Sequence, residues 1–174
     1  PGIGGHCLPC DPYYLSCKAR EYDFHVQFIE LAAQVNEHMP YYVVEQVRKA
    51  LDVKGKTLKD SWVLILGMAY KKDTADIRES PSIKLVELLN KEQAVVRYHD
   101  PFPKKVEFSF GTLWSDDEYY GNTSNYDCVV LAVDHSEYIK NKKYLTDPSN
   151  TKLLYDTKGI TYGINTKNVV RMGE

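Results

Sequence analysis

The sequence predicts an α/β protein in which a doubly wound, mainly parallel sheet follows a long amphipathic helix. Apolar residues recur at spacings of three and four between residues 22 and 51, as they do on one face of a helix. From residue 62 onward, short apolar runs alternate with helical patterns, which is typical of strands joined by parallel crossovers. Polar residues follow these runs directly, where open α/β sheets bind their ligands.

The helical segment covers residues 22–54 and ends at Lys54-Gly55-Lys56, a helix stop and short linker. Pro40 removes one main-chain donor and crowds the preceding turn, so we expect a kink or a break there. Long amphipathic helices beside small domains often mediate dimerisation, and we expect a homodimer through residues 22–52. The alternative is that the apolar stripe packs only against its own chain.

Residues 55–174 carry the predicted sheet. The first strand is the apolar run at residues 62–67, followed by a polar loop at 71–79. The next helix begins at Ser80-Pro81, with serine as N-cap and proline at the first helical position, and ends near Lys91. The other expected elements are strands at 94–98, 128–133, 152–156 and 169–170 and a short helix at 136–140, with an irregular acidic stretch before residue 128.

A polar set follows the predicted strands: Tyr70, Lys71, Lys72, Asp100, Asp134, His135, Asp156 and Lys158. The sheet is Rossmann-like, but only Gly67 follows its first strand, so the glycine motif that grips a dinucleotide is missing. Lys71, Lys72 and Arg78 alternate with acidic residues, which fits either a phosphate site or a solvated charge run. His25, His38, His99 and His135 are expected in loops or on the surface, with His135 also placed to border a substrate.

Composition limits the possible functions. The 174 residues are 43% hydrophobic and 26% charged, which is ordinary for a soluble globular protein. A formal charge of −2 provides no basic field for nucleic acid, and no apolar run is long enough to span a membrane. Nothing resembles a signal peptide, and the cysteines form no disulfide framework, so we expect a cytoplasmic protein with reduced thiols.

The first eleven residues are the most informative segment of the chain. Three glycines in four positions precede Cys7, and a carboxylate follows at Asp11. Such glycines permit unusual backbone conformations and let a ligand approach the main chain, so residues 1–21 are expected to form a catalytic cysteine loop. No strand precedes the segment to anchor it, and we expect a missing N-terminal partner to complete the site.

Two other chemistries fit the same cysteines. Cys7-Leu8-Pro9-Cys10 is a C-x-x-C motif, which in redox proteins follows a strand and opens a helix. Alternatively, a zinc ion could be bound by a thiolate and imidazole set: His6, Cys7, Cys10 and Cys17.

Two segments resemble the signatures of the UDP-glucose/GDP-mannose dehydrogenase family. They are residues 1–12, PGIGGHCLPCDP, and residues 67–81, GMAYKKDTADIRESP. The resemblance runs to about Asn165 and implies a catalytic loop, a central helix and a C-terminal UDP-sugar-binding domain, without the N-terminal NAD-binding domain. His6 and Asp156-Thr157-Lys158-Gly159 resemble the branch that oxidises UDP-N-acetylhexosamines.

The resemblance implies a 6-dehydrogenase that oxidises the C6 alcohol of a sugar to a carboxylate, with two NAD⁺ molecules as successive oxidants. It also implies that the product is used in polysaccharide synthesis. Cys7 matches the nucleophile, which captures the aldehyde as a thiohemiacetal and passes through a thioester, and Asp11 matches the carboxylate that assists proton transfer. The other implied roles are contact with the nucleotide sugar for Gly2, Ile3, Gly4, Tyr70, Lys71 and Lys158, and contact with the cofactor for Arg78. No metal is implied.

Two positions depart from the pattern of glucose-type relatives: Lys158 stands where they use Arg, and Cys10 replaces a common Lys. By itself, this chain is expected to be inactive, serving at most as a nucleotide-sugar-binding and dimerisation module.

Overall fold

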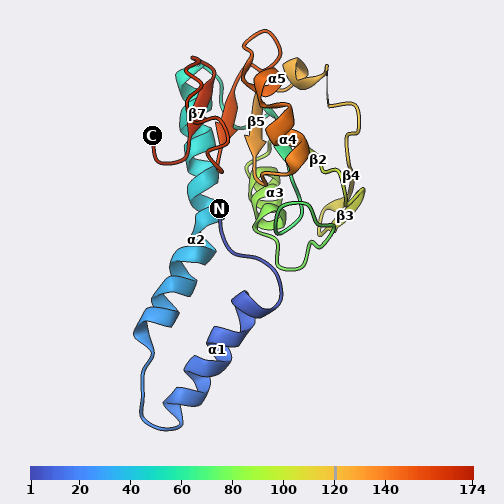
Figure 1. The fold of residues 1–174 in the computed structure, drawn as a ribbon. Coiled ribbons are helices and arrows are strands. Elements are labelled where there is room, and N and C mark those ends of the chain that lie inside the picture. Colours follow the sequence, from blue (N-terminus) through green and yellow to red (C-terminus); the bar gives the residue numbers. More distant parts are fainter. Residues whose placement is uncertain (120) are drawn as a thin grey trace.

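The computed structural model describes residues 1–119 and 121–174 of the chain. Two helices, α1 (Cys7–Arg20) and α2 (Gln27–Val53), precede an α/β domain. Figure 1 shows α1 and the first half of α2 projecting from this domain as a two-helix arm. The second half of α2 packs on the domain through the buried residues Val43, Val44, Val47, Ala50 and Leu51.

The arm corrects two predictions. Residues 1–21 are not a loop throughout, because α1 begins at Cys7. The helix expected from residue 22 is α2, which begins five residues later, at Gln27, after a turn at residues 21–26. Of the kink or break expected at Pro40, a break does not occur, since α2 continues through this buried proline. The apolar stripe divides in two: its second half is covered by its own chain, whereas Phe28, Leu31 and Val35 are exposed.

The sheet has five parallel strands. They are β1 (Trp62–Leu66), β2 (Val95–His99), β5 (Cys128–Leu131), β6 (Leu154–Asp156) and β7 (Val169–Arg171), in the spatial order β2-β1-β5-β6-β7. The order reverses direction between β1 and β5. In open α/β sheets the crevice beyond the carboxyl ends of such a strand pair is the usual ligand site.

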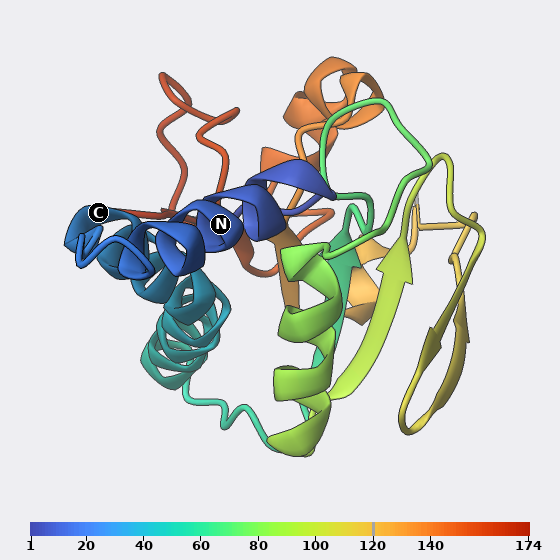
Figure 2. The ribbon, with the colours of Figure 1, turned by 90° about the horizontal axis from the view of Figure 1, so that it is seen from below.

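Helices cover both faces of the sheet, which confirms the doubly wound architecture (Figures 1 and 2). One core lies under α2 and α3 (Pro81–Lys91), and the other lies under α4 (Ser136–Lys140) and α5 (Lys142–Thr146). The Ser80 Oγ accepts a hydrogen bond from the Ser82 N–H at 3.3 Å, so the predicted cap of α3 is confirmed. None of the helices among the described residues is long and apolar enough to cross a bilayer.

The stretch before β5 contains elements that the sequence did not predict. A hairpin of β3 (Lys105–Phe108) and β4 (Gly111–Trp114) lies beside the edge strand β2, and a short 3₁₀ helix covers Thr123–Asn125. Both hairpin strands have only four residues and are mostly exposed, so they show little of the apolar pattern by which buried strands are recognised.

Two histidines expected in loops or on the surface are buried. His99 is 4% exposed. Its ring packs on that of Tyr119 at a tilt of 31°, with centroids 4.0 Å apart, and its Nδ1 lies 3.0 Å from the Tyr138 hydroxyl. Burial, followed by the charge of Lys104, lowers the pKa of His99 to about 4. The His135 side chain is completely buried, whereas His25 and His38 are exposed as expected.

Candidate functional site

Residues 67–80, which follow β1, are called the β1 loop here. The first five residues of the chain form a strap that lies across this loop. The Gly5 N–H donates to the Arg78 carbonyl at 2.9 Å. A Cβ atom on Gly4 would lie 2.6 Å from the Glu79 carbonyl oxygen and 2.7 Å from the Tyr70 Cβ. The sequence suggested that these glycines let a ligand approach the main chain. In the structure, the chain's own β1 loop makes this close approach instead.

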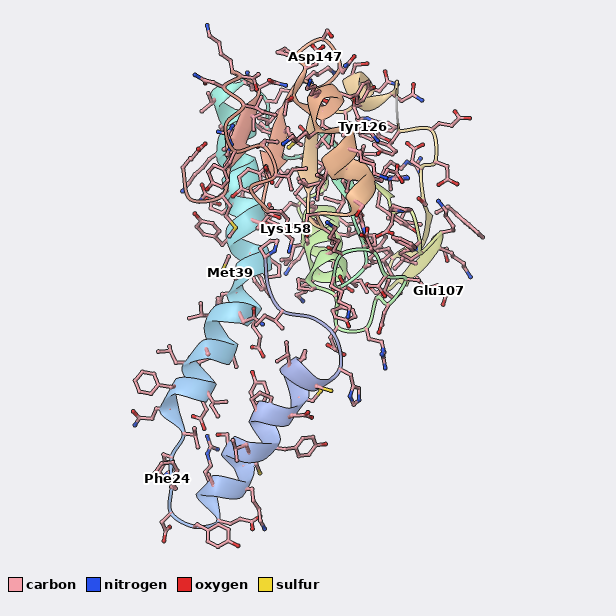
Figure 3. All side chains as sticks on the ribbon, in the orientation of Figure 1. Phe24, Met39, Glu107, Tyr126, Asp147 and Lys158 are labelled. Carbon is pink, nitrogen blue, oxygen red and sulfur yellow. The ribbon has the colours of Figure 1, made fainter. Side chains whose placement is uncertain are left out.

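A small cavity lies between the strap and the carboxyl ends of β1 and β5. It is lined by Pro1, Gly2, Pro40, Ala69, Tyr70, Pro81, Ser82, Leu85, Ala132, Val133 and Lys158. The cavity thus brings together Gly2, Tyr70 and Lys158, three of the residues assigned to the substrate. Figure 3 shows Lys158 close to the start of the chain, where the strap begins. This position matches the topological switch point of the sheet.

The buried Asp156 carboxylate shapes the turn that carries Lys158. Its Oδ1 accepts the N–H groups of Lys158 at 2.9 Å and Gly159 at 2.8 Å. Its Oδ2 accepts the Thr161 N–H at 2.9 Å and the Thr161 hydroxyl at 2.7 Å. The sequence placed Asp156 at a strand end but not in this role. An Asp that directly precedes a turn with glycine is the available signal.

Cys7 is exposed and is the first residue of α1. Asp11 is one turn further along the same helix, and residues at this spacing share a helix face with Cβ atoms about 6 Å apart. The hydrogen bond and charge of Asp76 chiefly raise the pKa of Arg78, with smaller contributions from the charges of Tyr70 and Cys7. The Cys7 sulfur therefore lies within electrostatic range of the Arg78 guanidinium.

The charged residues of the β1 loop are partly used to hold the loop itself. Arg78 donates to Asp76 through Nε at 3.0 Å and Nη2 at 2.6 Å, and these hydrogen bonds lower the pKa of Asp76 to about 2. The Lys71 ammonium lies 5.2 Å from the centre of the Tyr70 ring. Lys71, Lys72 and Arg78 are exposed and Arg78 is paired within the loop, as in a solvated charge run, whereas the anion site stays a prediction.

Not every assigned residue reaches the cavity. Ile3 is 51% exposed and lines a separate open groove of about 790 Å³ between α1, α2 and the start of α3. Gly4, within the strap, is buried against the β1 loop, and Cys7, Asp11 and Lys71 are not among the residues that line the cavity.

The β1 loop does not fit the diphosphate of a dinucleotide. The N–H groups of Met68 and Ala69, at the end of β1, both donate to the Asp100 carboxylate, at 2.7 and 3.0 Å. Gly67 packs so closely on Val133 that an added Cβ would lie 2.4 Å from its Cβ. The amides that would face a phosphate in a dinucleotide fold are therefore already used, in agreement with the missing glycine motif.

The structure bears differently on the two alternatives for the cysteines, a zinc site and a redox motif. Within residues 1–119 and 121–174, no three His, Cys, Asp or Glu side chains are grouped to hold a metal ion, and His6, Cys7, Cys10 and Cys17 form no such group. The C-x-x-C motif does open a helix, as a redox motif would, although the six residues described before it form no strand.

Comparison with known families places these features in context. Residues 64–162 match the model of the UDP binding domain of the UDP-glucose/GDP-mannose dehydrogenase family, and this match alone covers more than half of the chain. The chain belongs to this dehydrogenase family. Residues 1–38, which include the strap and α1, match the central domain of the same UDP-glucose/GDP-mannose dehydrogenases.

Individual members of the dehydrogenase family show the same likeness. UDP-N-acetyl-D-mannosamine dehydrogenase of Methanococcus vannielii is 33% identical over 92% of this chain and 36% of its own length. UDP-N-acetyl-D-glucosamine 6-dehydrogenase of Salmonella typhi is 34% identical over 79% of this chain and 32% of its own length. The structure of UDP-D-ManNAc dehydrogenase from Pyrococcus horikoshii superposes with a TM-score of 0.79 at 27% identity, over 98% of this chain and 38% of that one. The chain thus spans about a third of the length of these family members.

Proposed function

We propose that this chain is the catalytic-cysteine and UDP-sugar-binding part of an NAD-dependent 6-dehydrogenase that oxidises a UDP-N-acetylhexosamine to its uronate for polysaccharide synthesis. One observation carries the proposal. The Gly5–Arg78 hydrogen bond joins the segment that bears Cys7 to the β1 loop, whose Tyr70 lines the cavity together with Lys158. The segment that bears the proposed nucleophile matches the central domain of the family, and it is thereby linked to a cationic pocket lined in part by the UDP binding domain.

The small cavity marks the proposed UDP-sugar site, which extends beyond the enclosed space. Lys158 provides a positive charge for the diphosphate, with Lys71 as a second cation beyond Tyr70. Gly2 presents its main chain to the same cavity, and Ile3 and Gly4 continue the strap toward Cys7. The strap therefore offers backbone groups along a path from the nucleotide pocket to the sulfur.

Cys7 and Asp11 carry out the proposed chemistry. The Cys7 thiolate adds to the C6 aldehyde to form a thiohemiacetal, and hydride loss from that adduct leaves a thioester on the sulfur. Asp11, one helical turn away, assists the proton transfers and orients the water that releases the carboxylate. The two hydrides pass to two NAD⁺ molecules, which we place mainly on a domain outside this chain, with Arg78 reaching toward them.

The proposed division of the chain is a catalytic segment at 1–21, a central helical segment at 22–54 and the UDP-sugar-binding domain at 55–174. The test is turnover of the full-length cytoplasmic enzyme on a panel of UDP-hexoses and UDP-N-acetylhexosamines. We expect two NADH per sugar and a preference for an N-acetylated substrate, because the similar proteins named above act on N-acetylhexosamines. One NADH per sugar, or turnover of UDP-glucose alone, would contradict the assignment.

Replacing Lys158 by alanine removes the cation from the cavity. We expect UDP to bind the full-length protein about tenfold or more weakly, because a charge-assisted contact to phosphate is lost while the buried Asp156 keeps the turn folded. Isothermal calorimetry measures this effect. Lys167→Ala, at another exposed lysine, is the matched control and should leave UDP affinity unchanged. Equal affinities for the two variants would remove Lys158 from the site.

A second role is favoured by the exposed apolar face of the arm. Phe28 is 86% exposed, Leu31 54% and Val35 57%, so the helix offers an unpartnered surface for a homodimer through residues 22–52. In this second role, the chain by itself serves as a nucleotide-sugar-binding and dimerisation module and reduces no NAD⁺.

Sedimentation velocity tests the dimer. The wild-type protein should sediment as a dimer, and Phe28→Glu should shift it toward the monomer because a charge is then placed in an apolar interface. Lys91→Glu, at an exposed lysine at the end of α3 and outside residues 22–52, is the control and should leave the dimer intact. A monomeric wild-type protein would refute this role.

A further inference from the structure

A buried carboxylate–imidazole pair lies beneath the β1 loop. Asp100 directly follows β2, His135 lies beyond β5, and both side chains are completely buried. The His135 Nε2 is 3.1 Å from the Asp100 Oδ2. The pair therefore connects the ends of two strands that flank β1 on opposite sides.

The pair holds the β1 loop on both sides of Tyr70 and Lys71. Before them in the sequence, Asp100 Oδ2 accepts the N–H groups of Met68 and Ala69. After them, His135 Nδ1 accepts the Asp73 N–H at 2.9 Å. The Asp73 carboxylate in turn accepts the Ser136 N–H at 2.9 Å and the Ser136 hydroxyl at 2.5 Å.

The hydrogen bonds specify the state of each group. Because Nδ1 accepts an amide proton, the ring proton of a neutral His135 is on Nε2, where it is donated to Asp100. Burial alone would raise the pKa of Asp100, but the hydrogen bonds from His135 and from main-chain amides hold it below its usual range. The carboxylate is therefore ionised and fully engaged.

We infer that His135 is a positioning residue of the nucleotide-sugar site, acting through the Asp73 amide and Asp100 to hold Tyr70 against the cavity and Lys71 beside it. This inference rests on the proposed function of the cavity. It also accounts for the burial of a histidine at the carboxyl edge of the sheet, where the substrate is expected. Asp100 has the companion role, since it fixes the residues that directly precede Tyr70.

Two substitutions separate positioning from simple support of the fold. In His135→Asn, the amide oxygen takes the place of Nδ1 and still accepts the Asp73 N–H, whereas the donor to Asp100 is lost. In His135→Gln, the amide nitrogen takes the place of Nε2 and still donates to Asp100, whereas the Asp73 N–H is left unpaired. Each variant loses one hydrogen bond of His135. The larger loss of thermal stability is expected for His135→Asn, because its lost bond is to a buried ionised carboxylate.

The readouts are UDP affinity, melting temperature and hydrogen exchange in the full-length protein. For His135→Gln we expect about tenfold weaker UDP binding and faster exchange of the amides at residues 70–74, because that half of the loop is released. For His135→Asn we expect the protection of this segment to be kept and the affinity to stay within about threefold of wild type.

Ser136→Ala, a milder change at a partly exposed position, should speed exchange at Asp73 even if neither histidine variant folds.

The outcomes are distinct. Affinity losses that follow the melting temperatures of the two histidine variants, with His135→Asn the weaker binder, would show that His135 only supports the fold. Wild-type affinity and exchange in His135→Gln, or unchanged exchange in Ser136→Ala, would equally overturn the inference. Failure of the wild-type protein to bind UDP would instead refute the proposed function, while the exchange measurements would still report on the loop.

Discussion

Replacement of Cys7 by serine in the full-length protein should abolish uronate formation, with a loss of about 10³-fold or more in turnover. A serine hydroxyl is not ionised near neutral pH and does not capture the aldehyde as a thiolate does. The first hydride transfer needs no sulfur, so a burst of NADH without carboxylate is expected. Quenched-flow measurement of NADH together with chromatography of the sugar products tests both expectations.

Cys10→Ser is the matched control, because Cys10 lies in the same turn of α1 and is only partly exposed. This variant should turn over at a rate within about threefold of wild type, since no step of the proposed chemistry uses the second thiol. An equal loss in both variants would favour the C-x-x-C redox alternative instead. A full rate in Cys7→Ser would remove sulfur from the mechanism.

Replacement of Gly4 by alanine should have the second largest effect. Gly4 does not have a positive φ, so the effect is steric: the new Cβ would meet the Glu79 carbonyl and the Tyr70 Cβ. Neither atom is the end of a flexible side chain, so the strap must lift and weaken the Gly5–Arg78 hydrogen bond. We expect a loss of about 1–3 kcal/mol in unfolding free energy and about 10²-fold in kcat/KM, because Cys7 moves relative to the cavity.

Gly163→Ala provides the control for the glycine substitution. Gly163 has a φ of 82°, and an added Cβ would meet none of the described atoms within 4 Å. The change should cost about 1 kcal/mol through backbone strain and leave kcat/KM unchanged. Urea unfolding and steady-state kinetics on both variants test the comparison. Wild-type kcat/KM in Gly4→Ala would show that the strap does not position the nucleophile.

The buried elements of the fold were predictable from sequence because their signals are local. The run from Val63 to Leu66 is apolar at every position since both faces of β1 are covered, and Ser80-Pro81 carries the chemistry of a helix start. Helix α1 was missed because glycines and prolines surround its start. Pro9 nevertheless lies in the first turn, where the helix needs no main-chain donor.

The candidate site was only partly predictable. Strand-end residues such as Asp156 and Lys158 follow from the parallel sheet, while the roles assigned to Cys7 and Asp11 came from the family resemblance. The burial of His99 and His135 depends on loops that are distant in sequence and close over the strand ends, so no local pattern indicates it. The partners of Gly4 are likewise more than sixty residues away, in the β1 loop.

The account depends on a covalent bond between Cys7 and the sugar. Acid-quenching the full-length enzyme during turnover and mapping its peptides by mass spectrometry tests this bond directly. We expect the peptide that contains Cys7 to carry the mass of the nucleotide sugar acyl group, and this adduct to disappear when substrate is exhausted. Steady turnover with no adduct, or with the adduct on Cys10 or Cys17, would contradict the mechanism.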